Sequence, residues 1–86
     1  MTINLSQLSE RARAAVRSQD WGTVSACANS ILQQDANNPE GYFLTGLVER
    51  VSGRPALAAQ AFVRALELAV RRYDAAIELA MSRRHI

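Results

Sequence analysis

Residues 35–42 read Asp-Ala-Asn-Asn-Pro-Glu-Gly-Tyr and interrupt a chain whose other segments favour helix. Aspartate and asparagine favour turns, and Pro39 has a fixed backbone angle and no amide donor, which suits the first turn of a helix. Asn38 is the expected N-cap of that helix. The stretch therefore predicts the end of one helical hairpin and the start of the next.

The composition is that of a small helical protein. The chain has 86 residues, of which 49% are hydrophobic, while only four are glycine and two are proline. We therefore expect a single all-α domain with a thin core. No apolar run approaches the roughly 18 residues that cross a bilayer, and the N-terminal segment lacks the basic and apolar regions of a signal peptide. These features predict a cytoplasmic protein that does not insert into a membrane.

The residues that usually carry catalysis are scarce. Cys27 is the only cysteine, which excludes an intrachain disulfide, and we predict that it is a small core residue. His85 is the only histidine and is expected at a frayed chain end. Asp74 and Glu78 share a predicted helix face but lack the enclosing pocket that acid–base catalysis needs. The sequence therefore predicts no enzyme activity, no cofactor and no metal site.

All ten basic residues are arginine, which raises the question of nucleic-acid binding. Eight acidic residues reduce the net charge to +2, and no block of basic residues is interleaved with aromatic residues. An RNA-binding helical repeat would need a continuous basic groove, which Glu40, Asp74 and Glu78 would interrupt. We therefore predict no nucleic-acid partner and assign the arginines mainly to solvated helix faces.

The first two helices are expected to form an antiparallel hairpin. Apolar residues at steps of three and four predict a helix from about Leu5 to Ser18, which Asn4 and Gln7 open with a capping box. Asp20 is the expected N-cap of the second helix. Because only two residues separate these helices, they must fold back on each other.

The second half of the chain is expected to start with a helix from Pro39 to about Ser52, where Gly53 stops it. Pro55 then opens a fourth helix, and no glycine or proline follows it. A single helix of nearly thirty residues is therefore allowed. The alternative is a break near residues 71–72, which would separate a fifth helix of about residues 73–84.

The chain contains a degenerate internal repeat with a period of 34 residues. Residue identity is almost absent, but a small residue falls on a small residue where the helices of a hairpin cross, as Ala12 falls on Gly46. Other aligned pairs are Leu8 with Tyr42, Trp21 with Pro55, Val24 with Ala58, Ala28 with Phe62, Ile31 with Ala65 and Leu32 with Leu66. A second shift aligns Glu40 with Asp74, Phe43 with Ile77, Gly46 with Ala80, Leu47 with Met81 and Arg50 with Arg84. This second alignment favours the fifth helix, as the first helix of a third unit.

The second unit resembles the tetratricopeptide repeat. The aromatic, small and alanine positions of the family pattern are matched by Tyr42, Gly46, Ala58, Phe62 and Ala65. Thr45, Glu49 and Val70 depart from the pattern, and the first unit is degenerate. The resemblance implies one domain over residues 1–86, stacked as a short α-solenoid. Its first repeat would span about residues 5–38, its second about 39–72, and a C-terminal capping helix about 73–84.

The resemblance also implies a function, since members of this family are generally scaffolds that hold a peptide or helix of another protein in a concave groove. The groove residues implied here are Arg13, Arg17, Phe43, Leu47, Arg50, Ile77 and Met81. An apolar centre edged with arginine suits an amphipathic partner with acidic flanks.

Three alternatives stay open at the level of sequence. Phe43 and Leu47 would have no partner role if they pack against neighbouring helices of their own chain. If they are exposed, two chains could cover them by forming a homodimer. The segment could also be the N-terminal interaction or oligomerisation domain of a longer enzyme.

Overall fold

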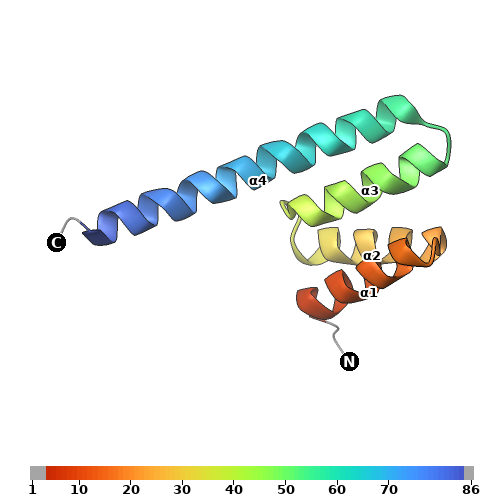
Figure 1. Cartoon of the computed structure of the whole chain (residues 1–86), viewed down its shortest axis with the longest axis horizontal. Coiled ribbons are helices and arrows are strands. Elements are labelled where there is room, and N and C mark those ends of the chain that lie inside the picture. The colour runs from red at the N-terminus through yellow and green to blue at the C-terminus, as the bar shows by residue number, and fades with distance from the viewer. Residues whose placement is uncertain (1–3, 85–86) are drawn as a thin grey trace.

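The computed structural model describes the backbone of residues 4–84 and the side chains of residues 4–81. Over that range the chain forms helices and turns but no strand (Figure 1). The helices are α1 (Leu5–Arg17), α2 (Trp21–Gln34), α3 (Pro39–Val51) and α4 (Pro55–Arg84). The predicted all-α class, with helices joined as antiparallel hairpins, is confirmed.

Side-chain caps define the first hairpin as predicted. The Asn4 side chain accepts a hydrogen bond from the Gln7 amide at 2.8 Å, and the Gln7 side chain accepts one from the Asn4 amide at 3.3 Å. Asp20 caps α2 by accepting hydrogen bonds from the Thr23 hydroxyl at 2.6 Å and the Thr23 amide at 3.3 Å, and these bonds lower the pKa of Asp20. Gln19, at φ +60°, adopts the left-handed conformation that reverses the chain between the two helices.

The stretch that begins at Asp35 forms the predicted turn. The Asn38 amide donates to the Asp35 carbonyl at 3.1 Å, and the Asn37 amide donates to the Asp35 carboxylate at 3.2 Å. The Asn38 side chain then accepts a hydrogen bond from the Glu40 amide at 2.9 Å, while Pro39 occupies the first turn of α3. Asn38 is thus the N-cap, and the turn makes α3 antiparallel to α2.

The core lies between α1, α2 and α3, and the first half of α4 packs against α3. Two glycines permit the closest approaches. A Cβ atom on Gly41 would lie 2.6 Å from the Leu32 side chain, and one on Gly46 would lie 2.4 Å from the Phe62 ring. Cys27 is buried in this core, as predicted. The buried hydrophobic residues are Leu8, Ala12, Ala15, Val24, Cys27, Ala28, Ile31, Leu44, Leu47, Ala58, Ala65 and Leu68.

α4 is one continuous helix of 30 residues, so the break that the repeat alignment favours near Arg71 and Arg72 is wrong. The alternative, a single long helix, is observed. The turn residues 35–39, Asp-Ala-Asn-Asn-Pro, are replaced one period later by Ala-Val-Arg-Arg-Tyr at residues 69–73. Because this second stretch has neither a helix breaker nor a capping side chain, each residue adds its backbone hydrogen bond to the preceding helix.

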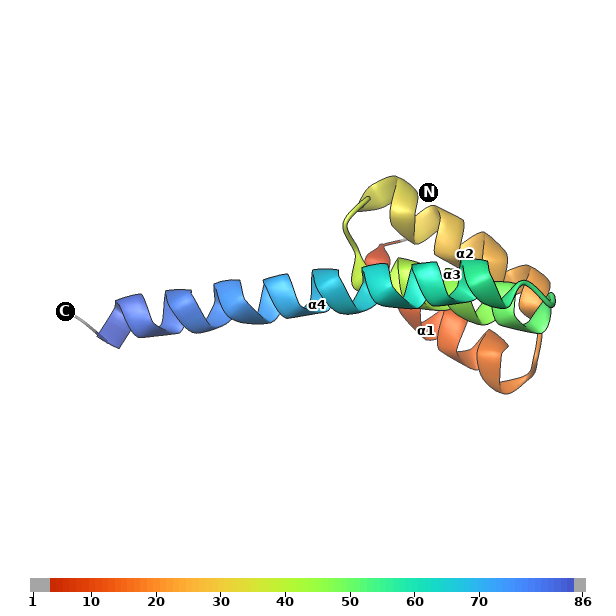
Figure 2. The same ribbon diagram turned by 90° about the horizontal axis from the view of Figure 1, so that it is seen from above.

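α4 leaves the rest of the protein at Arg72. The Arg72 guanidinium donates to the Asp35 carboxylate at 2.6 Å and to the Asn37 carbonyl at 3.1 Å. Leu68 is the last buried residue of α4, and residues 69–81 are exposed. The remainder of the helix projects outward (Figures 1 and 2). We call residues 73–84 the arm and residues 4–72 the body.

Candidate protein-binding groove

An open hollow of about 470 Å³ lies between α3 and the first half of α4. We call it the α3–α4 groove. Its lining residues are Pro39, Glu40, Phe43, Phe62, Ala65, Leu66 and Ala69. All of them except Glu40 are apolar, so the groove offers almost no polar group to a ligand.

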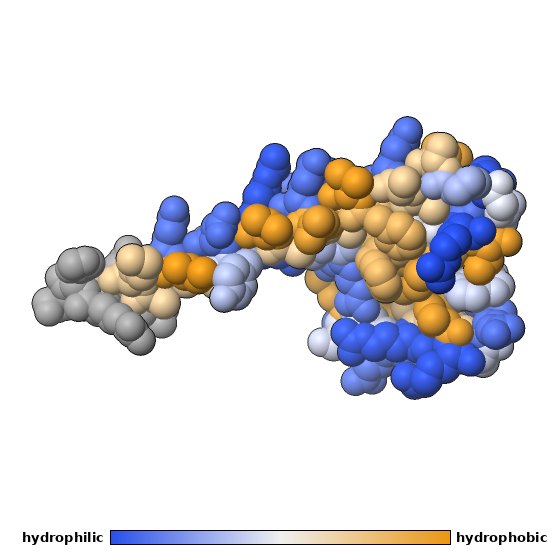
Figure 3. All heavy atoms as spheres, turned by 45° about the horizontal axis from the view of Figure 1, so that its top comes forward, coloured by the Kyte–Doolittle hydropathy of each residue, from blue (hydrophilic) through white to orange (hydrophobic). Residues whose placement is uncertain are grey.

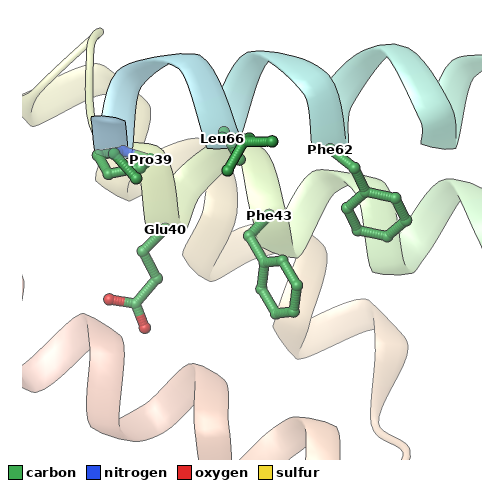
Figure 4. A pocket seen from close by; sticks show the side chains of 7 residues that line it. Pro39, Glu40, Phe43, Phe62 and Leu66 are labelled. Carbon is green, nitrogen blue, oxygen red and sulfur yellow. The ribbon is translucent and has the colours of Figure 1, made fainter. Parts of the chain in front are cut away.

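Two phenylalanines form the wall of the groove. The ring centroids of Phe43 and Phe62 lie 5.6 Å apart with the rings tilted by 47°, which is an ordinary geometry for an aromatic pair. Figure 4 shows both rings extending from the groove to the same side. Phe43 remains 48% exposed and Leu66 66% exposed. Apolar surface of this kind, concave and uncovered, commonly marks a site of interaction with another molecule.

The one carboxylate at the groove edge is already paired within the chain. The Ser9 hydroxyl donates to the Glu40 carboxylate at 2.7 Å, and Arg13 Nε lies 3.5 Å from the other carboxylate oxygen. Figure 4 shows the Glu40 side chain pointing away from the rings, toward α1. Glu40 therefore ties α3 to α1 and leaves the groove without an unbalanced charge.

The two apolar residues predicted on α3 lie in different surroundings. Phe43 lines the groove and is exposed, as predicted, while its contact with a partner stays a prediction. Leu47 is only 9% exposed and belongs to the core cluster with residues of α1 and α2. The prediction of Leu47 as a partner contact is therefore wrong, and the alternative core role is observed.

The three predicted arginines lie on α1 and α3. Arg13 is engaged with Glu40. Arg17 and Arg50 are exposed in the last turns of α1 and α3, and within residues 4–81 neither makes an ion pair. Two of the three guanidinium groups thus remain available at the surface.

Ile77 and Met81 lie on the arm, where they are 40% and 57% exposed. The structure does not bring them beside Phe43, because α4 runs straight past the body instead of bending back. The prediction that these residues complete one continuous groove within a single chain is therefore wrong.

The groove contains residues of α4 that the sequence analysis did not assign to a site, namely Phe62, Leu66 and Ala69. Their spacing of four and three residues places them on one helix face, beside the buried row of Ala58 and Ala65. This second apolar row is the sequence signal that could have identified the groove. A helix that packs on only one side needs one apolar row, so a second row predicts a further apolar surface.

A more polar surface lies elsewhere on α3 and α4. The Arg64 guanidinium lies 6.0 Å from the centroid of the Tyr42 ring and 3.5 Å from Glu67. Arg54 hydrogen-bonds Glu49, which lowers the pKa of Glu49 and raises that of Arg54. The α3–α4 groove is therefore the more apolar of these surfaces.

The described residues contain no group of three or more histidine, cysteine, aspartate or glutamate side chains placed to hold a metal ion. None of the helices in that range combines the length and hydropathy of a membrane span. His85 lies outside the described residues.

No protein family, curated protein or solved structure matches the chain.

Proposed function

We propose that the protein is a tetratricopeptide-like scaffold without catalytic activity, which binds an apolar helix of another polypeptide in the α3–α4 groove. The observation that carries the proposal is the groove itself. It is concave, and its lining side chains are apolar except for the paired Glu40. Phe43 is 48% exposed and Leu66 is 66% exposed. A hydrophobic groove beside two helices suits an amphipathic helix that inserts side chains at helical spacing.

Close packing within the second hairpin supports the tetratricopeptide-like part of the proposal. The Phe62 ring lies over Gly46, where a Cβ atom would clash with it. Ala58 and Ala65, the two alanines of the pattern, are buried at 3% and 8% exposure. On this proposal α1 with α2, and α3 with the first half of α4, are the first two units of a short solenoid.

The exposed arginines of α1 and α3 favour a partner helix with acidic flanks. Arg17 and Arg50 are exposed at the C-terminal ends of α1 and α3, where they can pair with carboxylates of a bound segment. Because Glu40 is already paired with Arg13, it adds little repulsion. A reducing compartment such as the cytoplasm suits the single buried thiol of Cys27.

A peptide library displayed on phage and selected on the immobilised protein tests the proposal. We expect the selected peptides to carry apolar residues at helical spacing next to aspartate or glutamate. Phe43→Glu and Leu66→Glu should each weaken binding of these peptides at least about tenfold, because a buried carboxylate without a partner is costly.

Leu57→Glu is the matched control. Leu57 is 48% exposed on the same helix but lines a different hollow, beside Tyr42 and Arg64. We expect this variant to bind the selected peptides as the unchanged protein does. Recovery of no helical peptides, or equal binding by the Leu66→Glu and unchanged proteins, would refute the proposed function.

A further inference from the structure

Residues 59–80 of α4 carry a heptad pattern of apolar residues. In the standard heptad lettering, position a is occupied by Val63, Val70 and Ile77. Position d is occupied by Ala59, Leu66, Tyr73 and Ala80. These residues follow one another at alternating steps of four and three, which is the spacing of a coiled-coil seam. We call them the α4 seam.

No other part of the described chain covers the α4 seam. Its five large residues are 40–69% exposed, and Ala59 and Ala80 are exposed as well. Successive residues of a helix point about 100° apart, so Leu66 faces well away from Ala65, which lies on the buried side of α4. Figure 3 shows apolar surface running along α4 from the body onto the arm. A second helix can therefore pack on the seam while α4 keeps its contacts with α3.

We infer that the α4 seam packs against the α4 seam of a second copy, as a parallel two-stranded coiled coil. All three residues at position a are β-branched, and β-branched residues at a with leucine at d favour two parallel strands. Two identical seams related by a twofold axis also place each residue opposite its own copy. The inference goes beyond the proposed function, because the seam shares only Leu66 with the α3–α4 groove.

The residues beside the seam favour the parallel direction. Position e holds the acids Glu67 and Asp74, whereas position g holds Phe62, Ala69 and Ala76. In a parallel pair each e residue faces a g residue of the other helix, so neither acid meets another acid. In an antiparallel pair with the seams fully overlapped, e faces e, and Glu67 of each copy would lie beside Asp74 of the other. This arrangement is disfavoured because like charges repel.

The parallel pair also leaves room for both bodies. Each body lies on the Ala65 side of α4, about 100° around the helix from Leu66 in the seam. A rotation of 180° about the axis of the helix pair therefore moves the second body to the far side of the pair. The bodies then lie at the same end of the coiled coil without competing for the same space, and the two arms run side by side.

The contact is small, so the dimer should be weak. The 30 residues of α4 form a helix about 45 Å long, and a strip about 10 Å wide along it amounts to roughly 900 Å² over the two copies. This area lies below the roughly 1,200–2,000 Å² of stable interfaces and within the range of transient ones. The two copies should therefore separate on dilution.

Light scattering between about 10 μM and about 1 mM tests the dimer, because a weak association appears only at high concentration. We expect twice the chain mass of 9.4 kDa at the upper end and the single mass at the lower end. A single mass throughout, or a mass of three or more chains, would overturn the inference. Peptide binding by such a protein would leave the proposed function intact.

Two glutamate variants of the arm test whether the seam makes the contact. Ile77 and Leu79 are both apolar and 40% and 56% exposed, but only Ile77 belongs to the seam, because Leu79 lies about 200° further around the helix. We expect Ile77→Glu to weaken the dimer at least about tenfold, since it buries a carboxylate without a partner. Leu79→Glu is the matched control and should dimerise as the unchanged protein does. Equal weakening by the two variants would overturn the inference.

Single cysteine variants test the direction of the helices. Ile77→Cys places two thiols opposite each other across a parallel seam, so we expect mild oxidation to link it to itself. Glu78→Cys is the control, because this exposed position points away from the seam and should not link. In an antiparallel pair the thiols of Ile77→Cys would lie about 21 Å apart and face residue 63. Linking of Ile77→Cys only to added Val63→Cys would therefore overturn the parallel arrangement. Cys27 is buried and contributes little background.

Discussion

Residues 35–39 and residues 69–73 occupy equivalent places in the 34-residue repeat, yet the chain turns back at the first and runs straight through the second. At the first place Asn38 caps a new helix and Pro39 opens it. At the second place Arg72 and Tyr73 stand instead, and the helix continues. Both places follow a helix that packs on its predecessor, so the packing before them does not distinguish them.

A helix thus ends where the local sequence provides a cap or a helix breaker, and it can continue beyond the point where its core contacts stop. Burial of α4 ceases after Leu68, four residues before the Arg72–Asp35 contact, but its backbone hydrogen bonds extend to Arg84. An uncovered apolar helix results. Its exposed residues then become available to a second polypeptide.

The largest effect is expected when the second place is given the sequence of the first. Replacing residues 69–73 by Asp-Ala-Asn-Asn-Pro should end α4 there, because proline in a helix interior costs about 3 kcal/mol. The arm can then fold back into the groove of its own chain. Small-angle scattering should show a monomer whose radius of gyration falls from 15.0 Å toward the roughly 12 Å of a compact chain of this length.

Replacing the same five residues by alanine is the control, since alanine is the strongest helix former. This variant should keep the long helix and the extended shape. If the turn-bearing variant keeps the mass and shape of the alanine variant, the turn sequence does not decide whether the helix breaks.

A second comparison uses residues that correspond by the repeat, Leu47 in the core and Met81 on the arm. Leu47→Ala should lower the free energy of unfolding by about 3 kcal/mol, because it removes buried methyl groups and leaves a cavity. Met81→Ala should change it by less than about 0.5 kcal/mol in dilute solution, where Met81 is exposed. Urea denaturation followed by circular dichroism measures both. Equal losses in dilute solution would mean that the arm is packed within the monomer.

The helix cap at the first place is expected to have a moderate effect. Asn38→Ala removes the side chain that accepts the Glu40 amide and should lower the free energy of unfolding by about 1 kcal/mol. Asn38→Asp keeps an accepting oxygen and should retain most of that stability. Thermal denaturation of the two variants checks the difference, and indistinguishable midpoints would show that the cap does not stabilise the turn.

The smallest expected effect concerns pH and the contact that joins the two places. The Arg72 hydrogen bond holds the pKa of Asp35 below its usual value. A carboxyl group whose pKa is lowered by folding adds stability above its unfolded-state pKa, and this contribution is lost as the pH falls through the folded-state pKa. The midpoint of thermal unfolding should therefore fall in acid. The carboxyls of Asp20 and Glu49, whose pKa values are also lowered, should contribute to the same fall.

Arg72→Gln isolates the share of Asp35, because it removes the cation and leaves the other two carboxyls unchanged. We expect this variant to lose less stability in acid than the unchanged protein does, and to be slightly less stable near neutral pH. If the unfolding midpoints of the two proteins fall by the same amount in acid, the Arg72 hydrogen bond does not lower the pKa of Asp35.

Much of the fold follows from local sequence. The caps at Asn4, Asp20 and Asn38, and the stop at Gly53 with φ +80°, act through bonds or backbone conformations within a few residues of themselves. Such short-range effects follow from neighbouring residues in the sequence. The predicted helix boundaries before Pro55 therefore lie close to the observed ones. The C-terminal half of α4 is the exception, because the repeat favours a break that no residue at 69–73 supports and that the structure does not contain.

The candidate site was less predictable. Phe43 and Leu47 share one apolar face of α3, and the spacing of four residues between them does not reveal which one is buried. That depends on how α1 and α2 lie against α3. The groove also needs Phe62 and Leu66 from α4, and their approach to Phe43 depends on the missing side chain of Gly46.

The sequence alone predicts the first three helices, the start of α4, the caps and the hairpin turns, because these depend on the conformational preferences and hydrogen bonds of neighbouring residues. The packing of the helices is what buries Leu47, leaves Phe43 and Leu66 at the surface, and leaves the arm free of its own body. Burial depends on how helices that are distant in sequence approach one another. A pattern of apolar residues predicts that a helix face will be buried, but it does not identify the surface that buries it.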